Sequence, residues 1–401
     1  MRKLSESSLK RNMELDRITN LPSDVSEQIL SFLPIKEAVK TSVLSSKWRY
    51  KTATLPHLVF DNQCFPTKPF TTLEHIVDQV LVLHVGPIHT FKLVREVPIA
   101  TGHIVRLILH LSRNAIKEFI LDDLVSLTLY NCLLKPPSTF KGFRSLKNLC
   151  LREVTSAQDV LQALIDCCSL LERLTLRTCS GISHLKINAP KLQFFDFAGS
   201  FENLNLENML NLVEIFIDLD CDSIRLVPNS STHLVKFFVH LPLVRRITIQ
   251  NDFLQYLAER ASPEKLSKPC LCLNFISITI GFCYADEVLT AVCLLGSAPA
   301  LQELKIQASV YGEDSEQEVN SWYDDNQNCQ FNQLRLVTIT NVSGFKAELD
   351  IIRFLLSCSP VLERMTVEPA SDVVSSKLLK ELVQFSRASP HAEIIYLGTL
   401  E

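Results

Sequence analysis

The sequence predicts an α/β fold in which a small N-terminal group of three helices precedes a long solenoid of parallel strands. Three observations support this prediction. Leucine accounts for 63 of the 401 residues, whereas only 10 are glycine, a type that usually makes up about 7% of a chain. A short pattern, LxxLxL, recurs at Leu171–Leu176, Leu301–Ile306 and Leu362–Val367. Each copy follows a stretch with helical periodicity, so the repeated unit is helix, turn and strand.

The chain starts with a polar, locally basic leader, residues 1–14, which we expect to be flexible. It has no apolar run of the length that a secretory signal needs. We therefore do not expect this segment to direct secretion, and the folded chain is expected to begin at about Leu15.

Three short helices are predicted between residues 15 and 60. In the first helix Val25, Ile29 and Leu33 recur at i, i+4 and i+8, and Pro34 ends it. A second short helix follows, and a third carries Trp48. A bundle of this size buries too little apolar surface to be stable alone. We therefore expect its surplus apolar surface to bind a partner.

A leucine-rich-repeat solenoid is predicted over residues 100–330. Further copies of the strand pattern occur at Leu124–Leu129, Leu146–Leu151, Leu192–Phe197, Leu212–Ile217, Leu234–Val239 and Leu334–Ile339. Up to residue 234, neighbouring copies start 20 to 25 residues apart, within the ~20–29-residue period of leucine-rich repeats. The spacing becomes irregular after about residue 234. Stacking of neighbouring units would build one continuous apolar core.

The residues between the leucines of LxxLxL should line the exposed face of the parallel sheet. Threonine takes the central position in five strands, at Thr128, Thr175, Thr248, Thr338 and Thr366. β-propensity alone explains threonine on an exposed strand, and a ligand-binding stripe is the alternative. Positions that mix charge with aromatic rings resemble a protein-binding surface. The predicted target contacts are therefore Tyr130, Arg152, Arg173, Arg177, Phe216 and Asp218.

Composition argues against several other classes of protein. The net charge of −4 gives no basic field for nucleic acid. No two glycines lie closer than Gly281 and Gly296, so glycine-rich phosphate loops and the GxSxG elbow are absent. No apolar run reaches the ~18 residues that span a membrane. The 13 cysteines are odd in number and form no CxxC pair, which favours reduced thiols in the cytoplasm and/or nucleus.

Catalytic and metal-binding motifs are also absent. The ten histidines show no HExxH spacing, and the acidic stretch between Gly312 and Asn328 lacks the DxDxDG spacing of a calcium loop. We therefore expect no cofactor, no metal and no catalytic residue in this chain.

The segment LPSDVSEQILSFLPIKEAVKTSVLSSKWR, which begins at Leu21, resembles the F-box. F-boxes dock onto the Skp-family adaptor of Skp–cullin–F-box ubiquitin ligases. The resemblance implies that the adaptor contacts are Leu21, Pro22, Ile29, Leu30, Leu33, Pro34, Val43 and Trp48. One difference from plant F-boxes is that Lys51 and Thr52 stand where a second tryptophan is usual.

The C-terminal part, residues 331–401, resembles the FBD domain of plant F-box/FBD/LRR-repeat proteins. The similar segments are FNQLR from Phe331, SPVLERMTV from Ser359 and AEIIYL from Ala392. This domain is expected to continue and cap the solenoid. Family members usually have more chain before Leu124, so we expect a seam in the solenoid near Asp122.

The resemblance implies a non-catalytic substrate-recognition subunit of a ubiquitin ligase. Its expected partners are the Skp-family adaptor, through it a cullin, and an unknown target protein held by the repeats. The alternative is a leucine-rich-repeat interaction scaffold with no active ligase role. A receptor that holds a small molecule between repeats is a more distant hypothesis.

Overall fold

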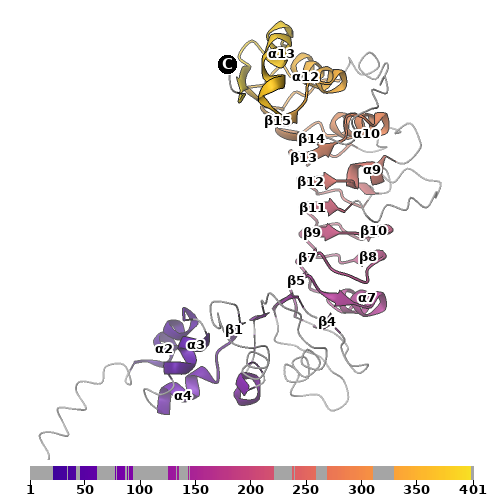
Figure 1. Cartoon of the computed structure of the whole chain (residues 1–401). Coiled ribbons are helices and arrows are strands. Elements are labelled where there is room, and N and C mark those ends of the chain that lie inside the picture. The colour runs from indigo at the N-terminus through magenta and orange to yellow at the C-terminus, as the bar shows by residue number, and fades with distance from the viewer. Residues whose placement is uncertain are drawn as a thin grey trace, which may run out of the picture. The chain divides into compact units, whose positions relative to one another are not determined.

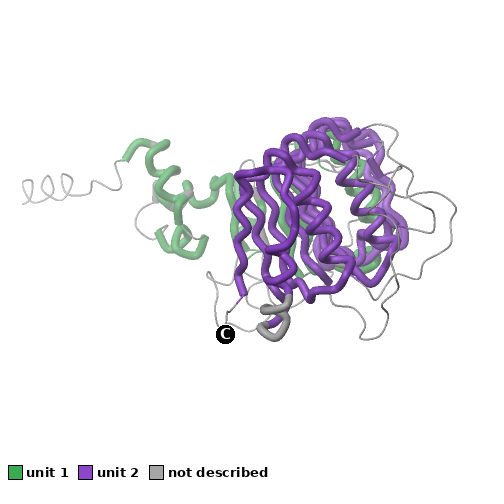
Figure 2. Tube along the Cα trace, turned by 90° about the horizontal axis from the view of Figure 1, so that it is seen from above, with its two compact units in different colours: residues 1–171, 179–181 green, residues 172–178, 182–401 purple. Residues whose placement is uncertain are grey.

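The computed structural model describes residues 21–33, 35–41, 46–60, 77, 79–85, 88, 90–93, 125–131, 133–134, 143, 145–220, 237–238, 240–258, 269–309 and 329–398 (Figure 1). The chain divides into two compact units, Met1–Leu171 with Cys179–Gly181 and Glu172–Thr178 with Ile182–Glu401 (Figure 2). The predicted leader and most of the acidic stretch after Gly312 lie outside the described residues.

The first unit opens with three short helices, as the sequence predicts. They are α2 (Ser23–Ser31), α3 (Ile35–Thr41) and α4 (Ser46–Thr52). Helix α4 packs against both α2 and α3. The centre of this small bundle is apolar, because Leu30, Ala38 and Trp48 are buried. The N-terminal helical domain of the predicted fold is therefore confirmed.

A parallel sheet begins directly after these helices. Its strands in the first unit are β1 (His57–Phe60), β2 (Thr90–Leu93), β3 (Ser126–Tyr130) and β5 (Asn148–Arg152), paired in that order. Two short strands, β4 (Leu133–Leu134) and β6 (Thr155–Ser156), pair separately, and helix α7 (Gln158–Asp166) follows. Strands β1 and β2 precede residue 100, where the solenoid was predicted to start.

The predicted seam near Asp122 falls on residues outside the described part of the chain. The strands on either side of it are described, however, and β2 pairs with β3 in parallel register, Phe91 opposite Leu127. Pairing of the sheet therefore continues from one side of this segment to the other.

Among its described residues, the second unit contributes nine strands to the main parallel sheet, in sequence order (Figure 1). They are β7 (Arg173–Arg177), β9 (Phe194–Gly199), β11 (Glu214–Leu219), β12 (Arg246–Asn251), β13 (Phe275–Ile280), β14 (Glu303–Ala308), β15 (Leu336–Val342), β16 (Arg364–Pro369) and β17 (Glu393–Tyr396). The alternating positions of LxxLxL point to the core, as at Leu174, Ile247 and Leu304, none of which is exposed. The parallel α/β solenoid is thus confirmed.

A repeated hydrogen-bond pattern sets the register of these strands. The carbonyl oxygen of Glu172 accepts the N–H groups of both Gln193 and Phe194, at 2.8 and 3.1 Å. The carbonyl of Arg245 does the same for Asn274 and Phe275. Because the same bond pair recurs from strand to strand, equivalent residues of each repeat lie opposite one another.

Helices and two short strands cover one face of the sheet in the second unit (Figure 1). The helices are α9 (Phe253–Leu257), α10 (Ala285–Gly296), α12 (Lys346–Cys358) and α13 (Asp372–Gln384). Strands β8 (His184–Asn188) and β10 (Asn203–Glu207) form a separate parallel pair. The predicted helices before residues 171, 301 and 362 correspond to α7, α10 and α12.

One predicted strand is wrong. Residues 234–239 match LxxLxL, but Phe237 and Phe238 are helical and buried edge to face against each other. The strand of this repeat is β12, where Val244, Ile247 and Ile249 provide the same spacing further along the chain. Two apolar runs, residues 234–239 and 244–249, both have the spacing of the strand of this repeat. Burial of the paired Phe237 and Phe238 rings favours the second run as the strand.

Candidate functional site

Helix α2 presents an exposed apolar surface. Ile29 is 40% exposed and Phe32, directly after the helix, is 80% exposed, with Val25 and Leu33 beside them at helical spacing. Val39 of α3 and Tyr50 of α4 are also exposed. We call this set the F-box patch: Val25, Ile29, Phe32, Leu33, Val39 and Tyr50. Val25, Ile29 and Leu33 share one face of α2 by their spacing, and exposed apolar side chains gathered in this way mark a site of protein association.

The predicted adaptor contacts divide into two groups in the structure. Pro22, Ile29 and Leu33 are exposed, and Leu21 is half-buried. Leu30 and Trp48 are only 1% and 3% exposed, because these side chains form the core of the bundle, and their role as adaptor contacts stays a prediction.

Pro34 and Val43 lie outside the described residues. For these two positions the prediction stays untested. The predicted adaptor contacts did not include Val25, Phe32, Val39 and Tyr50, whose side chains are also exposed.

Lys51 stands where plant F-boxes usually have a second tryptophan. Its ammonium group donates a hydrogen bond to the Ser26 hydroxyl, which itself donates to the Pro22 carbonyl at 2.8 Å. Thr52 donates to the Trp48 carbonyl at 3.0 Å. Lys51 thus ties α4 to α2 through a polar contact, and the helices pack together without the second tryptophan.

Two of the predicted target contacts are neighbours in the first unit. Tyr130 of β3 lies opposite Arg152 of β5 in the sheet register. The Tyr130 hydroxyl donates to Glu153 Oε1 at 2.8 Å. The Tyr130 phenol and the Glu153 carboxylate therefore meet where these two strands end, next to the position of Arg152 in the register.

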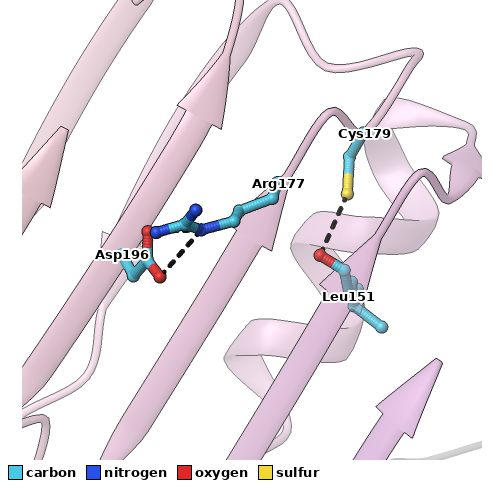
Figure 3. A network of polar contacts seen from close by, with 4 residues as sticks. All are labelled: Leu151, Arg177, Cys179 and Asp196. Atoms are coloured by element: carbon cyan, nitrogen blue, oxygen red, sulfur yellow. Dashed lines mark hydrogen bonds and ion pairs between the residues drawn. The ribbon is translucent and has the colours of Figure 1, made fainter. Parts of the chain in front are cut away.

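Arg177 is the centre of a polar and aromatic cluster in the second unit. Its Nε lies 3.0 and 2.9 Å from the two carboxylate oxygens of Asp196 on the next strand (Figure 3). The guanidinium carbon also lies 4.9 Å from the ring centroid of Phe216. The sequence predicted Arg177 and Phe216 as contacts, and the structure brings them together through Asp196, which the sequence did not identify.

Cys179 fills the position at which leucine-rich repeats place an asparagine or cysteine at the bend. Its thiol donates to the Leu151 carbonyl at 3.6 Å (Figure 3). This bond connects the segment after β7 to strand β5.

Sequence analysis missed the aromatic partners of the exposed cations. Arg173 stacks on Phe194, with 3.9 Å from its guanidinium carbon to the ring centroid. Phe275 lies between two cations, Arg246 at 3.8 Å and Lys305 at 5.5 Å. These cations cover Phe275 so well that it is 7% exposed, although it lies on the outer face of the sheet. Strand register aligns these positions in neighbouring repeats, and that alignment is the information that could have identified the cation–ring pairs.

Asp218 lies on the third exposed position of β11, opposite Gln250 of β12. It lies opposite Ala198 on the other side. It is half-buried and shares the outer face with Phe216 and Arg177.

The ten cysteines of the described residues are not paired in disulfides. Burial raises the pKa of Cys168 to about 12 and that of Cys270 to about 11, so both stay protonated at neutral pH. His84 is buried, with Nε2 2.9 Å from the Leu55 carbonyl.

The described residues contain no cluster of three or more histidine, cysteine or acidic side chains able to hold a metal ion. Nor is any helix among them both long enough and apolar enough to cross a membrane. The two surfaces described above are the exposed apolar side chains of the helical bundle and the outer face of the parallel sheet.

Comparison with known proteins identifies the origin of both surfaces. Residues 18–57 match the F-box domain family. Residues 114–189 and 187–390 match the leucine-rich-repeat domain described as At1g61320/AtMIF1, LRR domain. The chain is therefore an F-box protein with a leucine-rich-repeat domain.

Similar proteins occur in Arabidopsis thaliana. F-box/FBD/LRR-repeat protein At1g13570 is 37% identical over 410 residues, which cover 95% of this chain and 98% of that protein. Probable FBD-associated F-box protein At1g32375 is 23% identical over 427 residues, 95% of this chain and all of that protein. F-box/LRR-repeat protein At4g14103 is 46% identical over 84 residues, 20% of this chain and 22% of that protein. The chain belongs to the F-box/FBD/LRR-repeat family.

Proposed function

We propose that this chain is the substrate-recognition subunit of a Skp–cullin–F-box ubiquitin ligase. The F-box patch is the observation that supports the proposal. Its apolar side chains are exposed on a small bundle, and burying them against a partner would stabilise the complex. In this proposal the patch binds the Skp-family adaptor, which links the chain to a cullin. The intracellular location expected from the free thiols, cytoplasm and/or nucleus, is part of the same proposal.

The repeats hold the target protein in this proposal. The contacts on the outer face of the sheet are Tyr130 and Arg152 in one unit and Arg173, Arg177, Phe216 and Asp218 in the other. The chain itself performs no chemistry. It would hold the target beside the charged conjugating enzyme and so raise the effective concentration of the two reactants. Residues 331–401 are proposed to be the FBD domain.

Binding to the adaptor can be tested with Ile29→Ala, Phe32→Ala and Leu33→Ala combined. If these are interface anchors, the variant should lose ~2 kcal/mol or more of binding free energy, about 30-fold in affinity. Co-purification and titration with a purified Skp-family adaptor measure the loss. Val383→Ala removes an equally exposed apolar side chain from α13 and is the matched control. Trp48→Ala is less informative, since it would disrupt the core of the bundle.

Two outcomes would contradict the proposal. The first is adaptor bound equally well by a chain that lacks residues 15–55. The second is a folded triple variant with unchanged affinity. Full-length chain that captures neither adaptor nor cullin would favour the alternative, a leucine-rich-repeat interaction scaffold without a ligase role.

A further inference from the structure

The register of the second unit aligns a repeating series of side chains across the sheet. The first exposed position of each strand forms one row, in which every residue lies directly opposite the next. We call this the charged–aromatic row: Arg173, Phe194, Glu214, Arg246, Phe275, Glu303, Leu336, Arg364 and Glu393. The series is cation, apolar, anion, repeated three times except that leucine and arginine exchange order in the last triplet. Residues more than 200 positions apart in sequence thus form one pattern that no local motif contains.

The cations of the row are fixed in place by its aromatic rings. Arg173 stacks on Phe194 and Arg246 on Phe275, at 3.9 and 3.8 Å. A guanidinium held flat on a ring loses less conformational entropy on binding and keeps its edge available for a bidentate carboxylate. The row therefore presents oriented arginines at fixed positions.

The ion pairs within the row are weak enough for a partner to replace. Arg246 Nε lies 3.8 Å from Glu214, and Arg364 Nε lies 3.6 Å from Glu393. All four side chains are about half exposed. Exposed pairs of this kind contribute about 0–1 kcal/mol. A partner that offers a carboxylate to each arginine and a cation to each glutamate would lose little by separating them.

The second exposed position of each strand suits an extended chain. Five of its nine residues carry short hydroxyl side chains, Thr175, Thr248, Ser277, Thr338 and Thr366. An extended polypeptide has N–H and C=O groups that need hydrogen-bond partners, whereas a helix satisfies its own. Hydroxyls beside the row can supply both donors and acceptors.

We propose that the charged–aromatic row binds an extended segment of the target protein that carries acidic and basic side chains three residues apart. This deepens, and rests on, the proposed function of target recognition. Neighbouring strands lie about 4.8 Å apart, so Arg246 and Glu303, two strands apart, are separated by about 10 Å. An extended chain in the polyproline II conformation rises about 3.1 Å per residue and has three residues per turn, so an acid and a base three residues apart lie on the same side, about 9 Å from each other.

A displayed library of random 14-residue peptides, selected on the full-length chain, tests this proposal. Enriched peptides should place an acidic and a basic residue three positions apart. Exchange of the central charges, Arg246→Glu with Glu303→Arg, should weaken these peptides at least tenfold. A peptide with its two charges exchanged should show the opposite preference.

The matched control is Lys186→Glu with Glu207→Lys. This pair is also an exposed ion pair, 3.2 Å apart, but it lies on the separate sheet of β8 and β10. It should leave affinity unchanged. Where the central exchange does not fold, as judged by circular dichroism, Arg246→Gln with Glu303→Gln replaces it and should cause the same loss.

Three results would overturn the proposal: no enriched sequence, enriched sequences without the acid–base spacing, and peptides that bind the exchanged variant as tightly as the original. Adaptor binding is measured separately on the same proteins. If the peptide selection fails while adaptor binding is intact, peptide binding by the charged–aromatic row is rejected and the proposed ligase role is unaffected.

Discussion

At the scale of single residues, the ends of the strands impose a backbone conformation that the side chains do not favour. Asn131, Glu153 and Thr178 follow β3, β5 and β7 with φ of 48°, 53° and 52°. Left-handed backbone costs an L-residue about 1–2 kcal/mol, most for β-branched types. Among residues other than glycine, asparagine adopts positive φ most readily, so the β-branched Thr178 is the least suited of the three to this backbone conformation. The sequence suggested bends built without glycine, and this strain is their consequence.

Thr178→Gly should therefore raise the free energy of unfolding by about 1 kcal/mol. The Thr178 N–H, which donates to the Ala198 carbonyl, is retained, so the gain comes from relieved strain. Urea denaturation followed by circular dichroism measures it. Thr175→Gly, within β7, serves as the control and should destabilise the protein, because glycine weakens a strand. A loss of stability for Thr178→Gly would show that its side chain has another role.

At the scale of elements, two helices of the second unit begin in the same way. Glu287 of α10 accepts the Gly281 N–H at 2.8 Å. Glu348 of α12 accepts the N–H groups of Ser343, Gly344 and Phe345 at 3.0, 2.7 and 2.9 Å. Both glutamates are the third residue of their helix, and both are buried. Each carboxyl fixes the turn between strand and helix, which orients the helix on the sheet.

Glu287 should make the second unit less stable as the pH rises. Burial, and to a smaller degree Asp252, raises its pKa to about 7 from 4.5, while the Gly281 N–H opposes the shift. Because the pKa is higher in the folded state, its stabilising contribution is complete below about pH 4.5. It is lost as the pH rises through about 7.

Glu287→Gln should remove this dependence. Each pKa unit corresponds to about 1.4 kcal/mol, so wild type should lose ~2–3 kcal/mol between pH 4.5 and pH 8 that the variant keeps. Urea midpoints at four pH values test the prediction. Glu303→Gln, at a half-exposed position in β14, is the control for a general effect of charge. Parallel pH profiles for wild type and Glu287→Gln would contradict it.

Sequence patterns predicted the helices and strands well in segments where the apolar residues match only one repeat spacing. The helices α7, α10 and α12 and most strands from β3 onward fall where LxxLxL and helical periodicity placed them. Strand β13 was missed, although Leu273, Ile276 and Ile278 have the same spacing and residue types as the predicted copy at Leu212–Ile217. Strands β8 and β10 were missed because they pair with each other outside the main sheet, an arrangement that spacing within the chain does not encode.

At the scale of the whole molecule, the main sheet is formed by pairing between strands of consecutive repeats. Each strand of the second unit pairs only with the strands of adjacent repeats. Stability in such an array is close to a sum of local terms, so damage to one repeat should spread to its neighbours and fade beyond them.

Leu304→Ala tests this locality. Leu304 is fully buried in β14, and its truncation should cost about 2–5 kcal/mol. Hydrogen exchange should speed up most in β13, β14 and β15 and least in β7 and β9. Leu397→Ala, at an exposed position after β17, should change none of these rates. Uniform loss of protection across the unit would show that it unfolds as a single cooperative block.

The sequence by itself determined the type of protein: the F-box segment, the repeat, and the inward and outward faces of each strand. These depend on residues close together in the chain, where spacing reflects secondary structure directly. Tertiary structure decided which F-box residues are exposed, placing Leu30 and Trp48 in the core and Phe32 at the surface. It also decided the order of the charged–aromatic row. Both depend on packing between segments distant in sequence, which local periodicity does not specify.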